Sequence, residues 1–489
     1  MPSLRDQAIR GVFWSAVQNW GSAALGTLVF VILLRLLDAE QFGLLALAAV
    51  VVNFMEIFLR QGFGQAIVQR QDLEPGHLHT AFWINMVAAV ILTLVAVVGA
   101  DLAAAAFHEP GLAPVIRWLS LALPIGALNA TPQAILQRDL AFKSLAIRSL
   151  VGVAAGGIVG IAMALGGYGV WSLVGQQLTA AAIGTIVLWT ATGFRPGLTV
   201  SARHFRDLLR FGAHVVGAEL LAFLNQRLDR VLIGLFVGMQ AVGYYDVAQR
   251  LLLVMTQVLT QTVSTVALSA LSKLQENREQ MRSAFCTASR MTAAIAFPAF
   301  LGMAALSPEM VTVLFGPKWT PSIPIMQILV FIGILQSVTF FDGVVILACG
   351  KPAWRLAILL VNSLMNVAAL SIAARWGVVA VAAAFVIRGY VLWPLPALAV
   401  RNLIHLDTRG YLDRFAAPTA ASVTMVIVVL AVRRLLGPVT TTPIVLAAGI
   451  VAGVATYALV IHLLAPGLAR QMRDFATAAV ARTSVPTNG

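Results

Sequence analysis

The chain has 489 residues, of which 60% are hydrophobic and only 11% are charged. Apolar stretches of about 20 residues recur along its whole length, and each can span the ~30 Å hydrocarbon core of a bilayer, so a soluble globular protein is excluded. The formal net charge of +13 does not indicate a nucleic-acid partner, because the basic residues lie in short loops between apolar runs, which is a sign of membrane topology.

The apolar runs, separated by charged residues or by Gly and Pro, predict an all-α, polytopic membrane protein of fourteen transmembrane helices. These are expected to begin near Gly11, Glu40, Thr80, Gly111, Leu150, Gly169, Phe211, Ala241, Arg290, Pro321, Arg355, Val378, Tyr411 and Thr442.

Basic residues are distributed unequally between alternate loops. Of the 33 Lys and Arg residues, 22 fall on one side of the predicted bundle and six on the other, and five lie within spans. The side that is rich in Lys and Arg is the cytoplasmic one. Both termini are therefore expected in the cytoplasm of a multi-pass protein of the bacterial inner membrane.

The sequence also contains an internal duplication. Residues 36–48 align without a gap on residues 236–248, which places Gly43 on Gly243, and residues 135–147 align on 346–358. Gln61 also falls on Gln261, and residues 168–170 correspond to residues 376–378. These four matches in chain order predict that helices one to six are repeated as helices seven to twelve. The expected organisation is an N-terminal lobe (1–195), a parallel C-terminal lobe (196–405), and two appended helices with a cytoplasmic tail (406–489).

Polar residues follow one face of the predicted eighth helix over nearly the full membrane depth. Asp246, Arg250, Gln257, Gln261 and Ser264 lie on one narrow strip when the chain advances about 100° per residue. Such a strip does not face lipid, because unpaired polar groups there cost several kcal/mol each. It is either a hydrogen-bonded seam between helices or the wall of a water-lined path.

The predicted seventh helix carries charges inside the apolar segment "LNQRLDRVLIGLFVG", residues 224–238. Counting from a hairpin turn near Gln240 places Asp229 and Arg250 at equal depth, which predicts an ion pair, and places Asp246 within reach of Arg230. These charges either neutralise one another and fix the hairpin, or offer a cationic surface. Charges inside a membrane are functional candidates by default.

Further polar residues stand within other spans. Glu56 and Arg60 are spaced i,i+4 on helix two, so a self-contained pair is one interpretation. Arg388 has no acidic residue within four positions and needs a partner from elsewhere. The motif from Gly152 to Gly156 is typical of close helix packing.

No catalytic signature, phosphate-binding glycine-rich loop or Cys/His metal spacing is found, so neither a cofactor nor a metal is expected. The predicted outer loops are short, which disfavours a glycosyltransferase or polymerase acting at the outer face. The chain is therefore expected not to be an enzyme.

Several segments resemble one known family. They are residues 13–48, 64–70, 224–252, 267–285 and 314–329, and the resemblance extends from about residue 5 to about residue 400. It is a resemblance to Wzx-type polysaccharide transporters, including the colanic-acid exporter group, of the multidrug/oligosaccharidyl-lipid/polysaccharide (MOP) superfamily. The resemblance implies a fold like that of the superfamily's multidrug (MATE) transporters and the flipping of undecaprenyl-diphosphate-linked oligosaccharides through a cationic cavity. Lipid II flippases of the superfamily carry arginine in helix one, where this chain has Gln18 and Asn19, so a peptidoglycan precursor is the weaker substrate expectation.

The predicted function is that of an inner-membrane flippase that exports a lipid-linked O-antigen, capsule or exopolysaccharide unit by alternating access. The rivals are a cation-coupled multidrug antiporter of the same superfamily and, from another class, a polyprenol-dependent glycosyltransferase or polymerase. Expected partners are the lipid-linked oligosaccharide, membrane lipid, a coupling proton or sodium ion, and a polysaccharide polymerase with glycosyltransferases. The predicted substrate-binding residues are Arg60, Arg227, Arg230, Arg250, Arg388, Gln257 and Gln261, and the predicted ion-coupling residues are Glu56, Glu219, Asp229 and Asp246.

Overall fold

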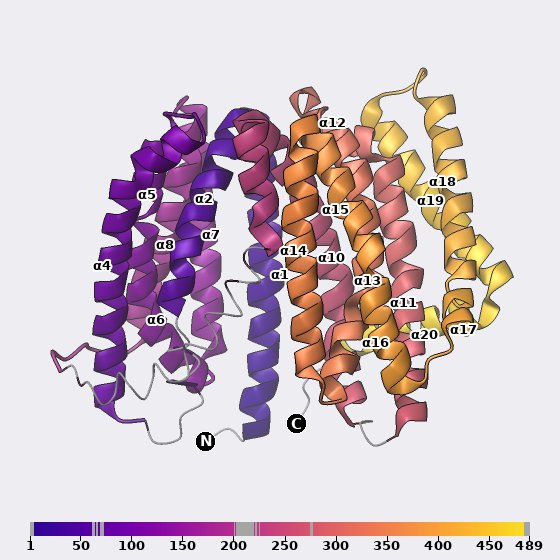
Figure 1. Cartoon of the computed structure of the whole chain (residues 1–489), viewed down its shortest axis with the longest axis horizontal. Coiled ribbons are helices and arrows are strands. Elements are labelled where there is room, and N and C mark those ends of the chain that lie inside the picture. The colour runs from indigo at the N-terminus through magenta and orange to yellow at the C-terminus, as the bar shows by residue number, and fades with distance from the viewer. Residues whose placement is uncertain are drawn as a thin grey trace. The chain divides into compact units, whose positions relative to one another are not determined.

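The computed structural model describes residues 4–60, 73–199, 225–273 and 277–483, together with residues 64, 67, 68, 201, 220 and 223. All regular elements within these residues are helices (Figure 1). The chain divides into two compact units, Met1–Asp246 and Val247–Gly489. Twelve helical segments of the described residues are long and apolar enough to cross a membrane.

The first unit is a bundle of long helices. Its elements are α1 (Leu4–Leu36), α2 (Ala39–Arg60), α4 (Pro75–Ala106), α5 (Leu112–Leu119), α6 (Ala122–Arg138), α7 (Phe142–Leu165) and α8 (Val170–Ala191). A helical segment at residues 225–236 and the first two turns of α10 (Met239–Lys273) complete the described part of this unit.

The second unit contains the rest of α10 and the remaining helices. These are α11 (Arg278–Ala305), α12 (Ser307–Leu314), α13 (Ser322–Ala348), α14 (Pro352–Ala373), α15 (Val378–Leu392), α16 (Pro394–Ile404), α17 (Thr408–Asp413), α18 (Ala416–Leu436), α19 (Thr442–Leu464) and α20 (Pro466–Thr483). Two short 3₁₀ turns, Pro317–Trp319 and Ala374–Trp376, lie between them.

The all-helical membrane fold agrees with the sequence prediction, and twelve of the fourteen predicted spans match the twelve candidate spans. The two others are the span predicted from Phe211, which lies mostly outside the described residues, and the one predicted from Ala241, which is part of α10. The number fourteen therefore stays a prediction, as do the lobe boundaries at 195 and 405.

The largest errors in the predicted helix starts are at two helices. The helices predicted from Leu150 and Arg290 begin at Phe142 and Arg278. Hydropathy detects only the part of a helix inside the hydrocarbon, whereas both helices continue into polar sequence beyond it. The start of α11 is fixed by Asn277, whose side chain accepts hydrogen bonds from the backbone N–H groups of residues 279 and 280 at 3.1 Å.

Prolines divide single predicted spans into two helices. Pro124 has no N–H to donate to the Ser120 carbonyl, and α5 and α6 are separated at that point. The Ser120 carbonyl instead accepts hydrogen bonds from the Leu123 backbone N–H at 2.9 Å and from the Thr93 hydroxyl at 3.3 Å. In the second unit, Pro394 separates α15 from α16 in the same way.

Glycines allow α7 and α8 to pack backbone against backbone. A Cβ atom at Gly152 would lie 2.8 Å from the Ala180 carbonyl oxygen, and one at Gly156 would lie 2.5 Å from the Gln176 carbonyl oxygen. These approaches are too close for any side chain, so the packing role predicted for this motif is confirmed. Helix α1 also contacts α7, where the Ser22 and Ser149 hydroxyls lie 2.9 Å apart.

The duplicated glycines lie in a reciprocal contact within the first unit. A Cβ atom at Gly43 of α2 would overlap the carbonyl oxygen of Met239, and one at Gly243 of α10 would overlap the carbonyl oxygen of Ala39. Ala39 and Met239 are themselves equivalent positions of the duplication. The first turns of two equivalent helices therefore cross through equivalent atoms, as expected of a duplicated sequence with local two-fold symmetry.

In the second unit, the appended helices α18 and α19 pack on α11 and α12. Tyr457 donates a hydrogen bond of 2.5 Å from its hydroxyl to the Ala294 carbonyl, and the Arg433 guanidinium pairs with Glu309 at 2.6 Å. Apolar residues fill the space between, with Leu306 and Met425 both buried.

Candidate functional site

The candidate site is built on the hairpin between the 225–236 helix and α10. The helix ends at Gly238, which adopts φ +106° and bonds from its N–H to the Ile233 carbonyl at 3.0 Å, the same carbonyl that accepts the last regular helical bond from Val237 at 2.8 Å. That left-handed conformation is one that glycine adopts without strain, and it ends the helix and lets α10 begin directly. The tight turn brings Arg230 opposite Asp246.

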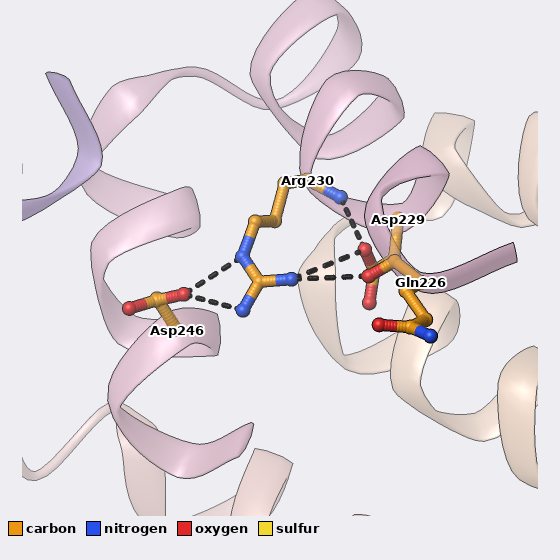
Figure 2. Close-up of polar contacts among 4 residues, drawn as sticks. All are labelled: Gln226, Asp229, Arg230 and Asp246. Atoms are coloured by element: carbon orange, nitrogen blue, oxygen red, sulfur yellow. Dashed lines mark hydrogen bonds and ion pairs between the residues drawn. The ribbon is translucent and has the colours of Figure 1, made fainter. Parts of the chain in front are cut away.

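Arg230 is the centre of the charge cluster (Figure 2). Its Nε donates to Oδ1 of Asp246 at 2.7 Å, and its Nη2 lies 2.6 Å from the same oxygen. Its Nη1 lies 3.7 Å from Oδ1 of Asp229 and donates to the Gln226 carbonyl at 3.2 Å. All three nitrogens of this guanidinium therefore face oxygen atoms of Asp246, Asp229 or Gln226.

Burial strengthens the interactions between the charges of this cluster. Arg230 is 4% exposed and Asp229 is 2% exposed. A buried guanidinium is tolerated only when carboxylates and carbonyls replace its hydration, and this arrangement supplies both. The Asp229 carboxylate also accepts a hydrogen bond from the Arg230 backbone N–H at 2.8 Å, which ties it to its own helix. The predicted proximity of Arg230 and Asp246 is confirmed.

Arg227 lies in the same helix, one turn before Arg230, and is half-buried. It lies within electrostatic range of Arg230, Asp229 and Asp246. Among the described residues, no hydrogen bond or ion pair holds its guanidinium, so its charge is available to a ligand. Arg227 is thus the adaptable cation of the cluster and Arg230 the fixed one.

The predicted site residues of the second unit lie on two helices. Arg250 is exposed on α10, one turn beyond Asp246. On α15, the half-buried Arg388 donates from Nη1 to the Asn362 carbonyl at 3.1 Å, and its guanidinium carbon lies 5.0 Å from the centre of the Phe385 ring. The partner that the sequence required for Arg388 is thus at least partly a backbone carbonyl and an aromatic face. The Asp229–Arg250 pair stays a prediction.

Other predicted residues are only partly described. Glu56 lies half-buried on α2. Glu219 lies outside the described residues, as do the side chains of Arg60, Gln257 and Gln261. In the part of the chain that the structure describes, no group of three His, Cys, Asp or Glu residues is arranged to hold a metal ion.

One acidic residue was missed by the sequence prediction. Asp342 is the only charged residue of α13 and is 5% exposed. A single carboxyl within a long apolar helix is a sufficient signal, but a prediction from clusters of charge passes over it.

Comparison with solved structures defines the class of the fold. The chain is similar to a solved structure of lipid II flippase MurJ in an inward closed conformation, with a TM-score of 0.75 and 16% identity over 94% of this chain and 99% of that chain. This likeness identifies the fold, an all-helical bundle shared with that structure.

The family follows from the sequence. The model for the polysaccharide biosynthesis protein family matches residues 32–324, and the chain belongs to this family. It is 28% identical to the lipopolysaccharide biosynthesis protein WzxC of Escherichia coli K12, over 69% of each chain. It is 27% identical to the succinoglycan biosynthesis transport protein ExoT of Rhizobium meliloti 1021, over 67% of each chain.

Proposed function

We propose that this protein is a flippase that moves an undecaprenyl-diphosphate-linked oligosaccharide from the inner to the outer leaflet of the bacterial inner membrane by alternating access. The observation that carries the proposal is the buried Arg230, held by Asp246 and Asp229 beside the available guanidinium of Arg227. The proposal is supported by family membership and by relatives whose names describe polysaccharide biosynthesis and transport. Under this proposal the protein is a transporter and not an enzyme.

The physical difficulty of this task is the diphosphate. Its charge cannot enter hydrocarbon unshielded, and guanidinium groups bind phosphate oxygens with two parallel hydrogen bonds. An arginine that is already neutralised by carboxylates cannot do this, so Arg230 holds the site in place and Arg227 contacts the head group. Arg60, Arg250 and Arg388 are proposed as further anion contacts along the path, with Gln257 and Gln261 as hydrogen-bonding groups for sugar hydroxyls.

The lipid part of the substrate needs an apolar surface. In the second unit, a groove of about 250 Å³ lies between α11, α18 and α19 and is lined by apolar side chains and glycines. A Cβ atom at Gly449 would lie 2.7 Å from the Leu306 side chain, so glycine at that position lets α19 pack closely on Leu306 at the wall of the groove. A polyprenyl chain is the occupant that matches both its chemistry and its place in a membrane protein.

An ion gradient is proposed to drive the cycle. Glu56, Glu219, Asp229 and Asp246 are the acidic residues that the sequence suggested for this role. Asp229 and Asp246 are both already paired with Arg230, so a coupling ion at either carboxylate would compete with that guanidinium. A polymerase and glycosyltransferases are the proposed partners, because they would supply and consume the exported unit.

The test of this function is the variant Arg227→Gln. Removing one charge-assisted contact to a phosphate weakens binding by about 1.5–3 kcal/mol, which is roughly ten- to a hundredfold. At matched protein levels, lipid-linked oligosaccharide should accumulate in the inner leaflet while surface polysaccharide decreases. Both pools are measured in the same cells.

The matched control is Arg117→Gln. Arg117 is also a helical arginine, but it is 41% exposed and paired with Asp101. This variant should export normally. Normal surface polysaccharide from a well-folded Arg227→Gln protein would end the head-group role of Arg227.

A further inference from the structure

Asp342 combines three properties that rarely occur together. It lies in the membrane-spanning helix α13, it is 5% exposed, and its Oδ2 is buried without a hydrogen-bond partner. Among the described residues, no Lys, Arg or His nitrogen lies within ion-pair distance of its carboxyl. This contrasts with Asp246, which has a guanidinium at 2.6 Å.

A cavity of about 240 Å³ opens beside this carboxyl within the second unit. Its walls come from α11, α13, α16 and α17, and they include the aromatic rings of Phe285, Trp393 and Tyr411. Phe285 and Tyr411 stack with their ring centres 5.4 Å apart and are both buried. Arg401, which is exposed, also lines the cavity and provides its positive charge.

The charges on neighbouring elements do not compensate Asp342. Arg355 donates to the Gly343 carbonyl, Arg388 to the Asn362 carbonyl, and Glu309 pairs with Arg433. The titratable and charged groups that the elements packed against α13 carry in this region include Cys286, Arg290, Glu309, Arg355, Arg388, Tyr390, Arg401 and Tyr411. In the described part of the chain, none of them forms an ion pair with Asp342.

An isolated carboxylate in such surroundings must acquire a positive charge or a proton. A bound cation would share the cavity with Arg401, whose charge repels it. A proton needs no space and can reach the carboxyl through water in the cavity. The arrangement thus favours proton binding.

We propose that Asp342 is a proton-binding site that exchanges with water through this cavity and supplies the coupling proton of transport. This deepens the proposed function and rests on it for the coupling, whereas proton binding at Asp342 can be measured independently. Under the predicted orientation, α13 ends in the cytoplasm, so the exchange would be with the cytoplasmic side.

The first experiment labels the purified full-length protein with dicyclohexylcarbodiimide, a lipophilic carbodiimide. It adds the O–H of a protonated carboxyl and rearranges to a stable N-acylurea, which is located by mass spectrometry. Asp342 should be modified and Asp246, paired with Arg230, should not. Modification should decrease by about tenfold per pH unit once the acid form becomes the minority. Equal labelling of both residues, or none at Asp342, would overturn the proposal.

The second experiment measures coupling in proteoliposomes that contain a lipid-linked oligosaccharide. Asp342→Asn keeps the shape and neutrality of the protonated carboxyl, so the variant should fold and still flip substrate down its own gradient. It should lose the acceleration by a pH gradient that the wild type shows. A full response to the gradient in this variant would contradict the proposal.

Failure of the proposed function can be distinguished from failure of proton binding at Asp342. If the wild-type protein moves no lipid-linked saccharide at all, the proposed function fails, while the labelling of Asp342 still decides whether the residue binds a proton.

Discussion

Two ion pairs of the same length differ in their surroundings, and this difference sets what each contributes. The Arg230–Asp246 pair has an N–O distance of 2.6 Å, with the two side chains 5% and 20% exposed. The Arg117–Asp101 pair has the same distance, with side chains 41% and 72% exposed. Water screens the second pair and hardly reaches the first.

We therefore expect Arg230→Gln to destabilise the protein by about 3–5 kcal/mol, because two carboxylates lose their shared cation. Arg117→Gln should cost about 0–1 kcal/mol. Thermal unfolding of the purified proteins in detergent, followed by size-exclusion chromatography, measures both. Combining Arg230→Gln with Asp246→Asn should recover part of the loss, and strictly additive losses would argue against the contact.

The residues of this cluster show how far side-chain contacts can be predicted from the sequence. Counting from the hairpin turn placed Arg230 opposite Asp246, because helical rise is regular. It did not reveal that Arg230 also approaches Asp229 and the Gln226 carbonyl, since those contacts depend on side-chain rotamers. Asp342 was missed because no neighbouring charge drew attention to it.

At the scale of elements, glycine decides how closely two helices approach. The α2–α10 crossing depends on Gly43 and Gly243, each of which faces a carbonyl oxygen where a Cβ would overlap it. Gly26 and Gly99 also lie within helices, but a Cβ at either would meet nothing within 4 Å. The same substitution, Gly→Ala, can therefore be compared at two crowded and two open helical positions.

Gly43→Ala and Gly243→Ala should each force the first turns of α2 and α10 apart and lower both thermal stability and export. Gly26→Ala and Gly99→Ala should leave export unchanged and raise stability by up to about 0.5–1 kcal/mol, because alanine is the better helix former. Thermal unfolding and surface polysaccharide are measured for all four variants. Unchanged thermal stability and export in Gly43→Ala would show that the close approach of α2 and α10 is not required for either property.

Sequence predicted the elements well in the hydrocarbon and less well outside it. The spans were found because about 20 apolar residues are needed to cross a bilayer, a constraint that leaves few alternatives. The starts at Phe142 and Arg278 were missed because polar helical turns beyond the bilayer carry no hydropathy signal. The helix breaks before Pro124 and Pro394 could have been read from the prolines themselves.

At the scale of the whole molecule, orientation is the property on which transport direction depends. The 22-to-six distribution of Lys and Arg predicts that the loops around residues 138–148 and 195–210 face the cytoplasm. Both termini then lie in the cytoplasm too, and the turn at Gly238 faces outward. The same orientation places the cavity beside Asp342 toward the cytoplasm.

Phosphatase fusions test this orientation directly, because the enzyme folds to an active form only outside the cytoplasm. Fusions at Thr80, Arg203 and Asp407 should be inactive, and one at Gln240 should be active. Gln240 is the decisive site, since it stands in the first turn of α10, directly after the hairpin turn that positions the candidate site. A reporter that is active only in the cytoplasm, fused at the same positions, should give the opposite pattern and controls for expression. Phosphatase activity at Arg203 would reverse the orientation, and with it the side from which Asp342 exchanges its proton.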